Sequence, residues 1–159
     1  MIYVLIPVFN RLKLTKSCIE SIKGNEKNLD LRIILVDDGS TDGTTEWVRD
    51  TYPEITILQG TGSLFWGGAI HYGVEYILKK CDSNDYILLV NNDVLLAENT
   101  IRELVNFSEE KNKVFKEEFL QIVASPKWGC PKISRDAFEK IKLLLDHVVT
   151  DSTRVYFLD

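Results

Sequence analysis

Residues 86–93 read Tyr-Ile-Leu-Leu-Val-Asn-Asn-Asp, a run of five mostly apolar residues followed by two amides and a carboxylate. Such a run suits a strand that is buried on both faces, as in a parallel sheet. Its polar tip then lies at the carboxyl end of the strand, the edge where ligands bind in open α/β sheets. Asp93, flanked by the amides Asn91 and Asn92, is suited to holding a hard cation through oxygen ligands. The alternative is a plain turn, because Asn and Asp are turn formers.

Two earlier apolar runs end in a similar way. Residues 2–6 lead into Pro7, which is expected to stop the ladder of strand hydrogen bonds, and residues 31–36 lead into two aspartates and a glycine. The polar or aromatic residues at the three ends are Phe9, Asn10, Asp37, Asp38, Asn91, Asn92 and Asp93. In a parallel sheet these ends share one edge, so the three motifs together indicate a site more strongly than any one of them.

Helical patterns separate these strands. Apolar spacing predicts helices over residues 12–22, around Trp47 and Val48, over 69–80 and over 98–111, with a short strand at 55–58. Asp42 or Thr41 is expected to cap the helix that carries Trp47. The alternating order predicts a three-layer α/β/α sandwich with a mostly parallel sheet. Beyond residue 111 the pattern favours a strand at 119–124, a helix at 134–145 and a terminal apolar run at 155–158.

Bulk properties narrow the class of protein. The 159 residues suit one domain, and a composition with 45% hydrophobic and 27% charged residues is ordinary for a soluble protein. A net charge of −5 without a basic block argues against nucleic acid as a partner. Three widely spaced cysteines, Cys18, Cys81 and Cys130, suggest reduced thiols and a cytoplasmic location. The apolar start is too short for an integral membrane segment, so membrane association would have to be peripheral.

The motifs, taken in their order along the chain, resemble those of the family 2 glycosyltransferases, which have the type A glycosyltransferase (GT-A) fold. Residues 4–11 (VLIPVFNR) resemble the family's first strand and turn, and residues 36–44 (VDDGSTDGT) resemble its second-strand motif. Residues 64–69 (LFWGGA) with Gly73 are similar to a stretch of its rhamnosyltransferase-like branch, and residues 91–93 stand in place of its D-x-D motif.

The resemblance implies a donor site for a nucleoside-diphosphate sugar. Pro7, Phe9 and Asn10 would line the base, and Asp38 would accept a hydrogen bond from a pyrimidine imide N–H. Asp37 would support the same turn or the ribose, and Asn92 would lie near the ribose. Asp93 would hold Mg²⁺ or Mn²⁺, which bridges the diphosphate. The residues left for the donor sugar and diphosphate are Trp66, Gly67, Gly68 and Asn91.

Three of these assignments carry further expectations. Gly67 and Gly68, placed before a helix, would let backbone amides approach the diphosphate. Trp66 is equally suited to packing at the rim of the core and to stacking on a sugar. The family commonly has Asp where Asn91 stands, so the neutral amide lowers the charge of the metal site.

The acceptor half departs further from the family pattern. Residues 133–141 (ISRDAFEKI) resemble a segment that lies further beyond the D-x-D motif in relatives, which implies about 40 to 60 missing residues after Lys127. The chain stops where the family's acidic catalytic motif is expected, and that motif supplies the general base in inverting members. The candidates by chemistry alone are Asp146, Asp151 and Asp159. We therefore expect one shortened domain, with a donor half at residues 1–112 and a remnant of the acceptor half at 113–159.

Three functions remain open at this point. The first is an inverting, metal-dependent glycosyltransferase that acts on a glycan or lipid-linked acceptor in polysaccharide or cell-surface glycan synthesis. The second is a non-catalytic sugar-nucleotide-binding domain that lacks the catalytic base. The third, a nucleotidyltransferase on a similar sheet, is disfavoured because no glycine-rich basic motif follows the first strand.

Overall fold

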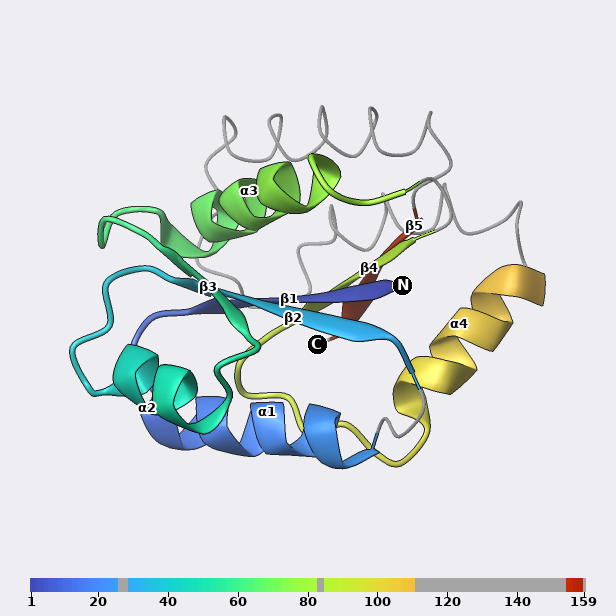
Figure 1. The fold of residues 1–159 in the computed structure, drawn as a ribbon, viewed down its shortest axis with the longest axis horizontal. Helices are drawn as coiled ribbons and strands as arrows, with labels where there is room; N and C mark the ends of the chain where they lie inside the picture. The colour runs from blue at the N-terminus through green and yellow to red at the C-terminus, as the bar shows by residue number, and fades with distance from the viewer. Residues whose placement is uncertain (26–28, 83–84, 111–153, 159) are drawn as a thin grey trace, which may run out of the picture.

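A parallel sheet runs through the middle of the protein. The computed structural model describes residues 1–25, 29–82, 85–110 and 154–158. Its strands are β1 (Ile2–Val8), β2 (Leu31–Asp37), β3 (Thr56–Gln59), β4 (Tyr86–Val90) and β5 (Arg154–Leu158). Their order in the sheet is β3-β2-β1-β4-β5, and every neighbouring pair is parallel (Figure 1). The predicted parallel sheet is confirmed.

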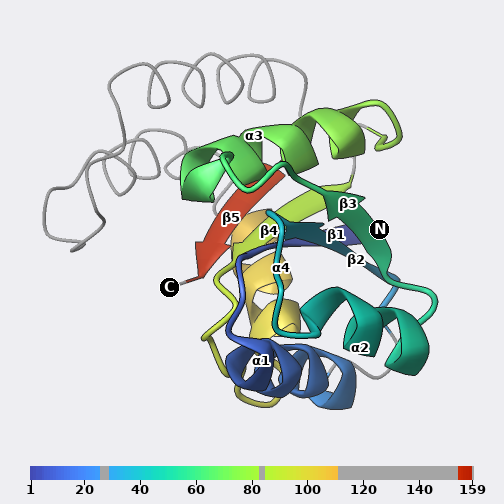
Figure 2. The same cartoon turned by 90° about the vertical axis from the view of Figure 1, so that its left-hand side faces the viewer.

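Helices cover both faces of this sheet. One face carries α1 (Leu12–Asn25), α2 (Thr44–Thr51) and α4 (Thr100–Glu110), and the other carries α3 (Phe65–Leu78) (Figures 1 and 2). Successive β1 side chains point to opposite faces. Val4 and Ile6 pack with α1, while Tyr3 and Leu5 pack with α3. Because both faces of the strands are buried, their sequences are apolar throughout, and the three-layer α/β/α architecture is confirmed.

The strand order determines where the loops meet. The chain steps from β1 outward to β2 and β3, and then returns to the opposite side of β1 to form β4. The order of the strands therefore reverses beside β1. In open α/β sheets the crevice for a ligand forms at such a switch point, outside the carboxyl ends of the strands. In this protein the loops that follow β1, β2 and β4 lie at that position.

Two expected boundaries are wrong. Pro7 does not end β1: the strand continues to Val8, which still pairs with Asp37 of β2. Pairing with β4 stops earlier, at Leu5, so the proline ends one ladder and leaves the other intact. Helix α3 begins at Phe65 rather than near residue 69.

The glycine pair at the start of α3 is part of the helix. The N–H of Gly68 donates to Leu64 O at 3.0 Å, a bond that closes the first helical turn. Gly67 and Gly68 were expected to precede the helix, but they lie inside it despite their low helical propensity. The glycine pair therefore does not precede a helix, and the backbone amide expected of Gly68 is already used.

Several expectations lie outside the described residues. They are the strand at 119–124, the helix at 134–145, Cys130, and the candidate bases Asp146, Asp151 and Asp159. The terminal apolar run corresponds to β5, which pairs with β4 from Tyr86 to Val90. Among the helices that the structure describes, none has the length and apolar character needed to cross a bilayer.

Candidate functional site

The loops after β1 and β2 are joined by side-chain hydrogen bonds. Asn10 has a positive φ of 58°, a conformation that Asn tolerates better than most residues. Its amide Oδ1 accepts the N–H of Thr41 at 2.9 Å, and its own N–H donates to Ser40 Oγ at 2.7 Å. Asn10, expected to line a base, thus also fixes the position of the neighbouring loop.

Asp38 connects the end of β2 to the loop before α3. Its Oδ1 accepts the N–H of Gly62 at 2.7 Å, and its Oδ2 accepts the N–H of Phe65 at 3.0 Å. The side chain is only 5% exposed. Each carboxylate oxygen can accept more than one hydrogen bond, so Asp38 remains able to accept one from a ligand. Gly60 lies so close that an added Cβ would be 2.5 Å from Asp38 Oδ1.

Asp37 has a different environment. Its side chain is fully buried, Oδ1 accepts the N–H of Ser40 at 2.8 Å, and Oδ2 accepts the hydroxyl of Thr45 in α2. Gln59 of β3 donates to the same Thr45 oxygen at 2.9 Å. Of the two expected roles, support of the turn agrees with these contacts, whereas the ribose role would require a group exposed to solvent.

The tip of β4 is held from both faces of the sheet. Trp66 Nε1 donates to Asn91 Oδ1 at 2.9 Å, which ties α3 to the tip. Asn92 is buried, and its Nδ2 donates to Thr15 Oγ1 of α1 at 3.1 Å, so its side chain points toward the helix. Cys18 donates to Asn91 O at 3.5 Å; burial, with a smaller contribution from Asp93, raises the pKa of this thiol to about 12. Cys18 is therefore a neutral structural donor.

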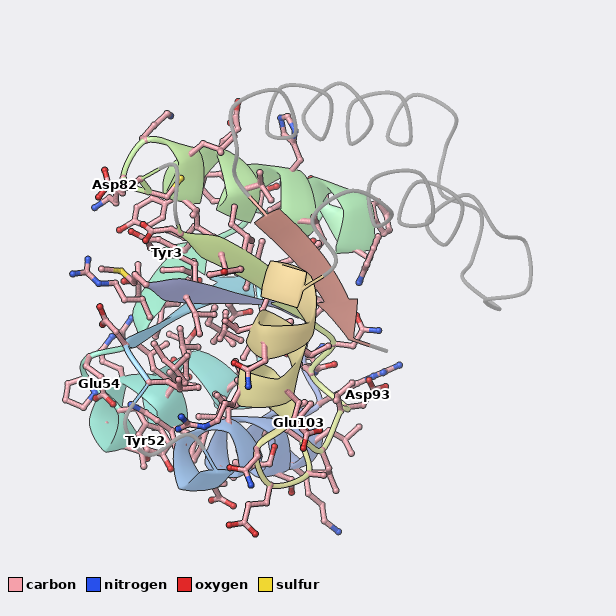
Figure 3. All side chains as sticks on the ribbon, turned by 90° about the vertical axis from the view of Figure 1, so that its right-hand side faces the viewer. Tyr3, Tyr52, Glu54, Asp82, Asp93 and Glu103 are labelled. Atoms are coloured by element: carbon pink, nitrogen blue, oxygen red, sulfur yellow. The ribbon has the colours of Figure 1, made fainter. Side chains whose placement is uncertain are left out.

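Asp93 is the exposed member of this tip. Its side chain is 47% exposed and its Oδ2 lies 3.4 Å from Nη1 of Arg11, which follows β1. Figure 3 shows Asp93 beyond the strand ends, on the side toward which the arrow of β5 points. The structure thereby brings the first and third motifs together. Arg11, like Asn10, has a positive φ; it ends the motif at residues 4–11, but the sequence had assigned it no role of its own.

The aromatic residues of the site divide into packed and exposed rings. Trp66 is half-buried and packs against the core on the α3 side, which favours its role in packing. Phe9 is 57% exposed and Phe65 is 80% exposed. Phe65 was not among the site residues predicted from the sequence. The only feature of the sequence that pointed to it was its position beside Trp66. Pro7 is buried within β1.

The donor set for a metal is small. In residues 1–25, 29–82, 85–110 and 154–158, no group of three or more His, Cys, Asp or Glu side chains is arranged to hold a metal ion. Asp93 offers one exposed carboxylate, and Asn91 Oδ1 is already bonded to Trp66. This set fits a cation held by one carboxylate, water and the phosphates of a ligand, a mode typical of Mg²⁺. It does not fit an all-protein metal cage.

Comparisons with known proteins identify the family of the chain. The sequence model described as "Glycosyl transferase family 2" matches residues 3–147. Glycosyltransferase GlyG of Streptococcus pneumoniae serotype 4 is 30% identical over 118 residues, which are 70% of this chain and 36% of that protein. An uncharacterized glycosyltransferase of Rickettsia bellii is 29% identical over 118 residues, covering 70% of this chain and 16% of its own. The chain thus spans about a third of the length of the first relative and about a sixth of the second.

Solved structures share the fold. TarS 1-349 of S. aureus, in complex with UDP-GlcNAc, is 20% identical with a TM-score of 0.56, over 70% of this chain and 32% of that one. The mannosyltransferase PcManGT of Pyrobaculum calidifontis, in complex with GDP-Man and Mn²⁺, is 22% identical with a TM-score of 0.55, over 88% and 38%. Both likenesses confirm a GT-A type of fold. With the family model matching residues 3–147, the chain belongs to glycosyl transferase family 2.

Proposed function

We propose that this chain carries the donor site of a glycosyltransferase that moves a sugar from a nucleoside diphosphate to an acceptor hydroxyl with inversion. The observation that supports this best is the meeting of three strand-end motifs at the switch point of the sheet. Asn10 is bonded to the loop after β2, and Arg11 pairs with Asp93 after β4. A nucleoside diphosphate laid along this edge would have its base near Asp38 and its phosphates near Asp93.

We assign one role to each residue at this edge of the sheet. Asp38 accepts the imide N–H of a pyrimidine base, strengthened by the charge of the acceptor. Phe9 and Asn10 line the base, and the buried Pro7, Asp37 and Asn92 hold the loops that present these groups. Trp66, Gly67, Gly68 and Asn91 form the wall toward the donor sugar.

Mg²⁺ or Mn²⁺ is the proposed cofactor, with Asp93 as its protein ligand. A divalent cation here would neutralise charge that develops on the departing nucleoside diphosphate. Arg11 is 61% exposed and pairs with Asp93 only loosely, so it can release the carboxylate to a cation. Its guanidinium would then be available to a phosphate oxygen.

The acceptor and the setting are inferred from the family. We place the reaction in polysaccharide or cell-surface glycan synthesis, with a glycan or lipid-linked acceptor reached from the cytoplasm. Cys18 and Cys81 are free thiols, in agreement with a reducing compartment. Residues 64–69, with their rhamnosyltransferase-like pattern, make dTDP-sugars donors to test beside UDP- and GDP-sugars.

A second candidate, a sugar-nucleotide-binding domain without catalysis, rests on the carboxylates of this edge. Asp37, Asp38 and Asp42 all accept backbone N–H groups. Asp38 is further assigned to the nucleotide base, and Asp93 is assigned to the cation. In the part of the chain that the structure describes, this leaves none of the four aspartates free to deprotonate an acceptor. Release of sugar from a sugar nucleotide by the purified chain would exclude this candidate.

The donor site is tested by calorimetric titration of UDP, dTDP and GDP into the purified chain with and without Mn²⁺. We expect one nucleoside diphosphate to bind, with Mn²⁺ tightening the binding. Asp93→Ala should remove most of the Mn²⁺ effect, whereas Asp50→Ala, which removes an exposed carboxylate of α2, should leave it unchanged. If no nucleoside diphosphate binds to the wild-type chain, the donor-site assignment is wrong.

A further inference from the structure

Phe65 combines two features that are unfavourable for a large apolar residue. Its side chain is 80% exposed, so its ring gains little from burial. Its φ of 52° lies in the left-handed region. This conformation is energetically unfavourable for a residue as bulky as phenylalanine. A strained residue with an exposed ring, located beside a ligand site, indicates that the ring has a use other than folding.

Hydrogen bonds on both sides hold Phe65 in this conformation. Its own N–H donates to Asp38 Oδ2 at 3.0 Å, and the next residue, Trp66, donates to Asn91 Oδ1 at 2.9 Å. Leu64 and Trp66 pack against the core on the α3 side, but Phe65 belongs to neither core cluster. The backbone at Phe65 is therefore fixed between the ends of β2 and β4, while its ring remains in solvent.

The order of the strands places this ring relative to the other exposed aromatic. Phe9 follows β1, Asp38 follows β2 and Phe65 follows β3, and β2 lies between β1 and β3. Phe9 and Phe65 thus follow the two strands that flank β2, the strand that Asp38 follows. A planar base whose edge is bonded to Asp38 would have its two faces directed toward aromatic side chains.

We propose that Phe65 forms the second aromatic wall of the base subsite, with Phe9 as the first and Asp38 at the edge of the base. This inference rests on the proposed function, because it requires a nucleotide at the site. Stacking is tolerant of base identity because every base has a π face. Phe65 therefore increases affinity for any nucleoside, and the choice among bases is left to Asp38.

Three substitutions at this position separate the ring from the backbone strain. Phe65→Gly removes the ring and relieves the positive φ, so the melting temperature should stay equal or rise while nucleotide affinity falls. Phe65→Leu keeps bulk and strain but removes the π face. Phe65→Tyr keeps the face. From the usual contribution of base–aromatic stacking, we expect a loss of about 5- to 150-fold in affinity for the Gly and Leu variants.

The choice of ligands tells a stacking role from a general disturbance of the site. UDP and uridine should both bind more weakly to Phe65→Gly and Phe65→Leu, and Phe65→Tyr should bind like the wild type. Inorganic pyrophosphate with Mn²⁺ has no base, so its affinity should not change in any variant. Tyr72→Ala is the matched control, because Tyr72 is an exposed aromatic two turns further along α3.

The outcomes distinguish this inference from the proposed function. If the wild-type chain binds UDP and both Phe65→Gly and Phe65→Leu bind it within twofold of wild type, the second wall is refuted and the donor site stands. Equal weakening of UDP and pyrophosphate would also overturn the inference, because it would show a displaced loop. If the wild-type chain binds no nucleotide, the proposed function fails before Phe65 is tested.

Discussion

Asp42 joins two helices through one carboxylate. Its Oδ2 accepts the N–H of Leu12, the first residue of α1, at 2.7 Å. Its Oδ1 accepts both the N–H and the hydroxyl of Thr44, the first residue of α2. Gly43 occupies the N-cap position of α2 and offers no side chain, so Asp42 satisfies orphan N–H groups of both helices. Asp42 thus caps α2 as expected, but from the residue before the N-cap position, and it also caps α1.

Asp42→Ala should destabilise the fold by about 0.5–2 kcal/mol, the usual cost of losing a helix cap. Burial alone would raise the pKa of Asp42, but hydrogen bonds from Thr44 and the Leu12 N–H outweigh it and hold this pKa below its ordinary value. The unfolded chain therefore takes up the proton first, and the stabilisation is lost as pH falls from about 4 through the folded pKa. Urea unfolding at pH 6 and pH 3 measures both effects.

Asp42→Asn is the control for the pH dependence. Its amide oxygen still accepts a hydrogen bond but does not titrate. The stability difference between wild type and Asp42→Ala should shrink at pH 3, whereas that between Asp42→Asn and Asp42→Ala should stay constant. If wild type is more stable than Asp42→Ala by the same amount at pH 3 as at pH 6, the hydrogen bonds of Asp42 do not depend on its charge and this account is wrong.

The aspartates of this edge show what the sequence could and could not predict. The run of residues 36–44 and the Asp93 position were enough to predict the edge of the sheet on which they lie. Asp37 and Asp38 are adjacent and chemically identical, yet one is bonded within the β2–α2 turn and the other reaches the loop before α3. That difference depends on tertiary partners such as Thr45 and Gly62, which adjacency in the sequence does not encode.

At the scale of elements, α3 approaches the sheet closely at Gly73. A Cβ added there would lie 2.2 Å from Leu5 Cδ1 of β1 and 2.8 Å from its Cδ2. Leu5 is fully buried. The glycine thus permits α3 to lie against the centre of the sheet.

Gly73→Ala should destabilise the protein by about 1–3 kcal/mol through overpacking against Leu5. Leu5→Ala alone should cost about 2–5 kcal/mol, and the double variant should cost less than the sum because the added methyl fills part of the cavity. Gly24→Ala in α1 is the control: nothing lies within 4 Å of its added Cβ, and alanine should stabilise the helix by about 0.5–1 kcal/mol. Denaturant unfolding that gives Gly73→Ala and Gly24→Ala equal stabilities would refute the close contact.

Element types were easier to predict than element ends. Continuous apolar runs marked β1, β2 and β4 because these strands are buried on both faces, and the helical spacing of α1 and α3 reflected one buried face each. The start of α3 was missed because Gly67 and Gly68 have low helical propensity. The helix is positioned by hydrogen bonds that Phe65 and Trp66 donate to Asp38 and Asn91, which follow other strands.

At the scale of the whole molecule, this edge of the sheet is held together by contacts between residues that are far apart in the sequence. Arg11 meets Asp93, Asn10 meets Thr41, Asp38 meets Gly62, and Trp66 meets Asn91. Each contact joins loops that lie far apart in sequence but follow neighbouring or nearby strands in the order β3-β2-β1-β4. A site arranged this way before ligand binding loses less entropy when the ligand binds.

Charge on the whole chain adds a test of how the donor is held. The net charge is −5, and a nucleoside diphosphate is also anionic, so their long-range interaction is repulsive. Salt between about 0.01 and 0.15 M shortens the screening length from about 30 Å to about 8 Å. Without a divalent cation, added NaCl should therefore leave UDP affinity unchanged or raise it.

With saturating Mn²⁺ the sign of the salt effect should reverse. The cation would join Asp93 to the diphosphate, so the dominant interaction becomes an attraction, which screening weakens. Calorimetric Kd values at 0.01 and 0.15 M NaCl, with and without Mn²⁺, give the two slopes, and Asp93→Ala should show the cation-free slope in both. An affinity that falls with salt even without Mn²⁺ would contradict this account, because it would require a basic phosphate site that outweighs the charge of the whole chain.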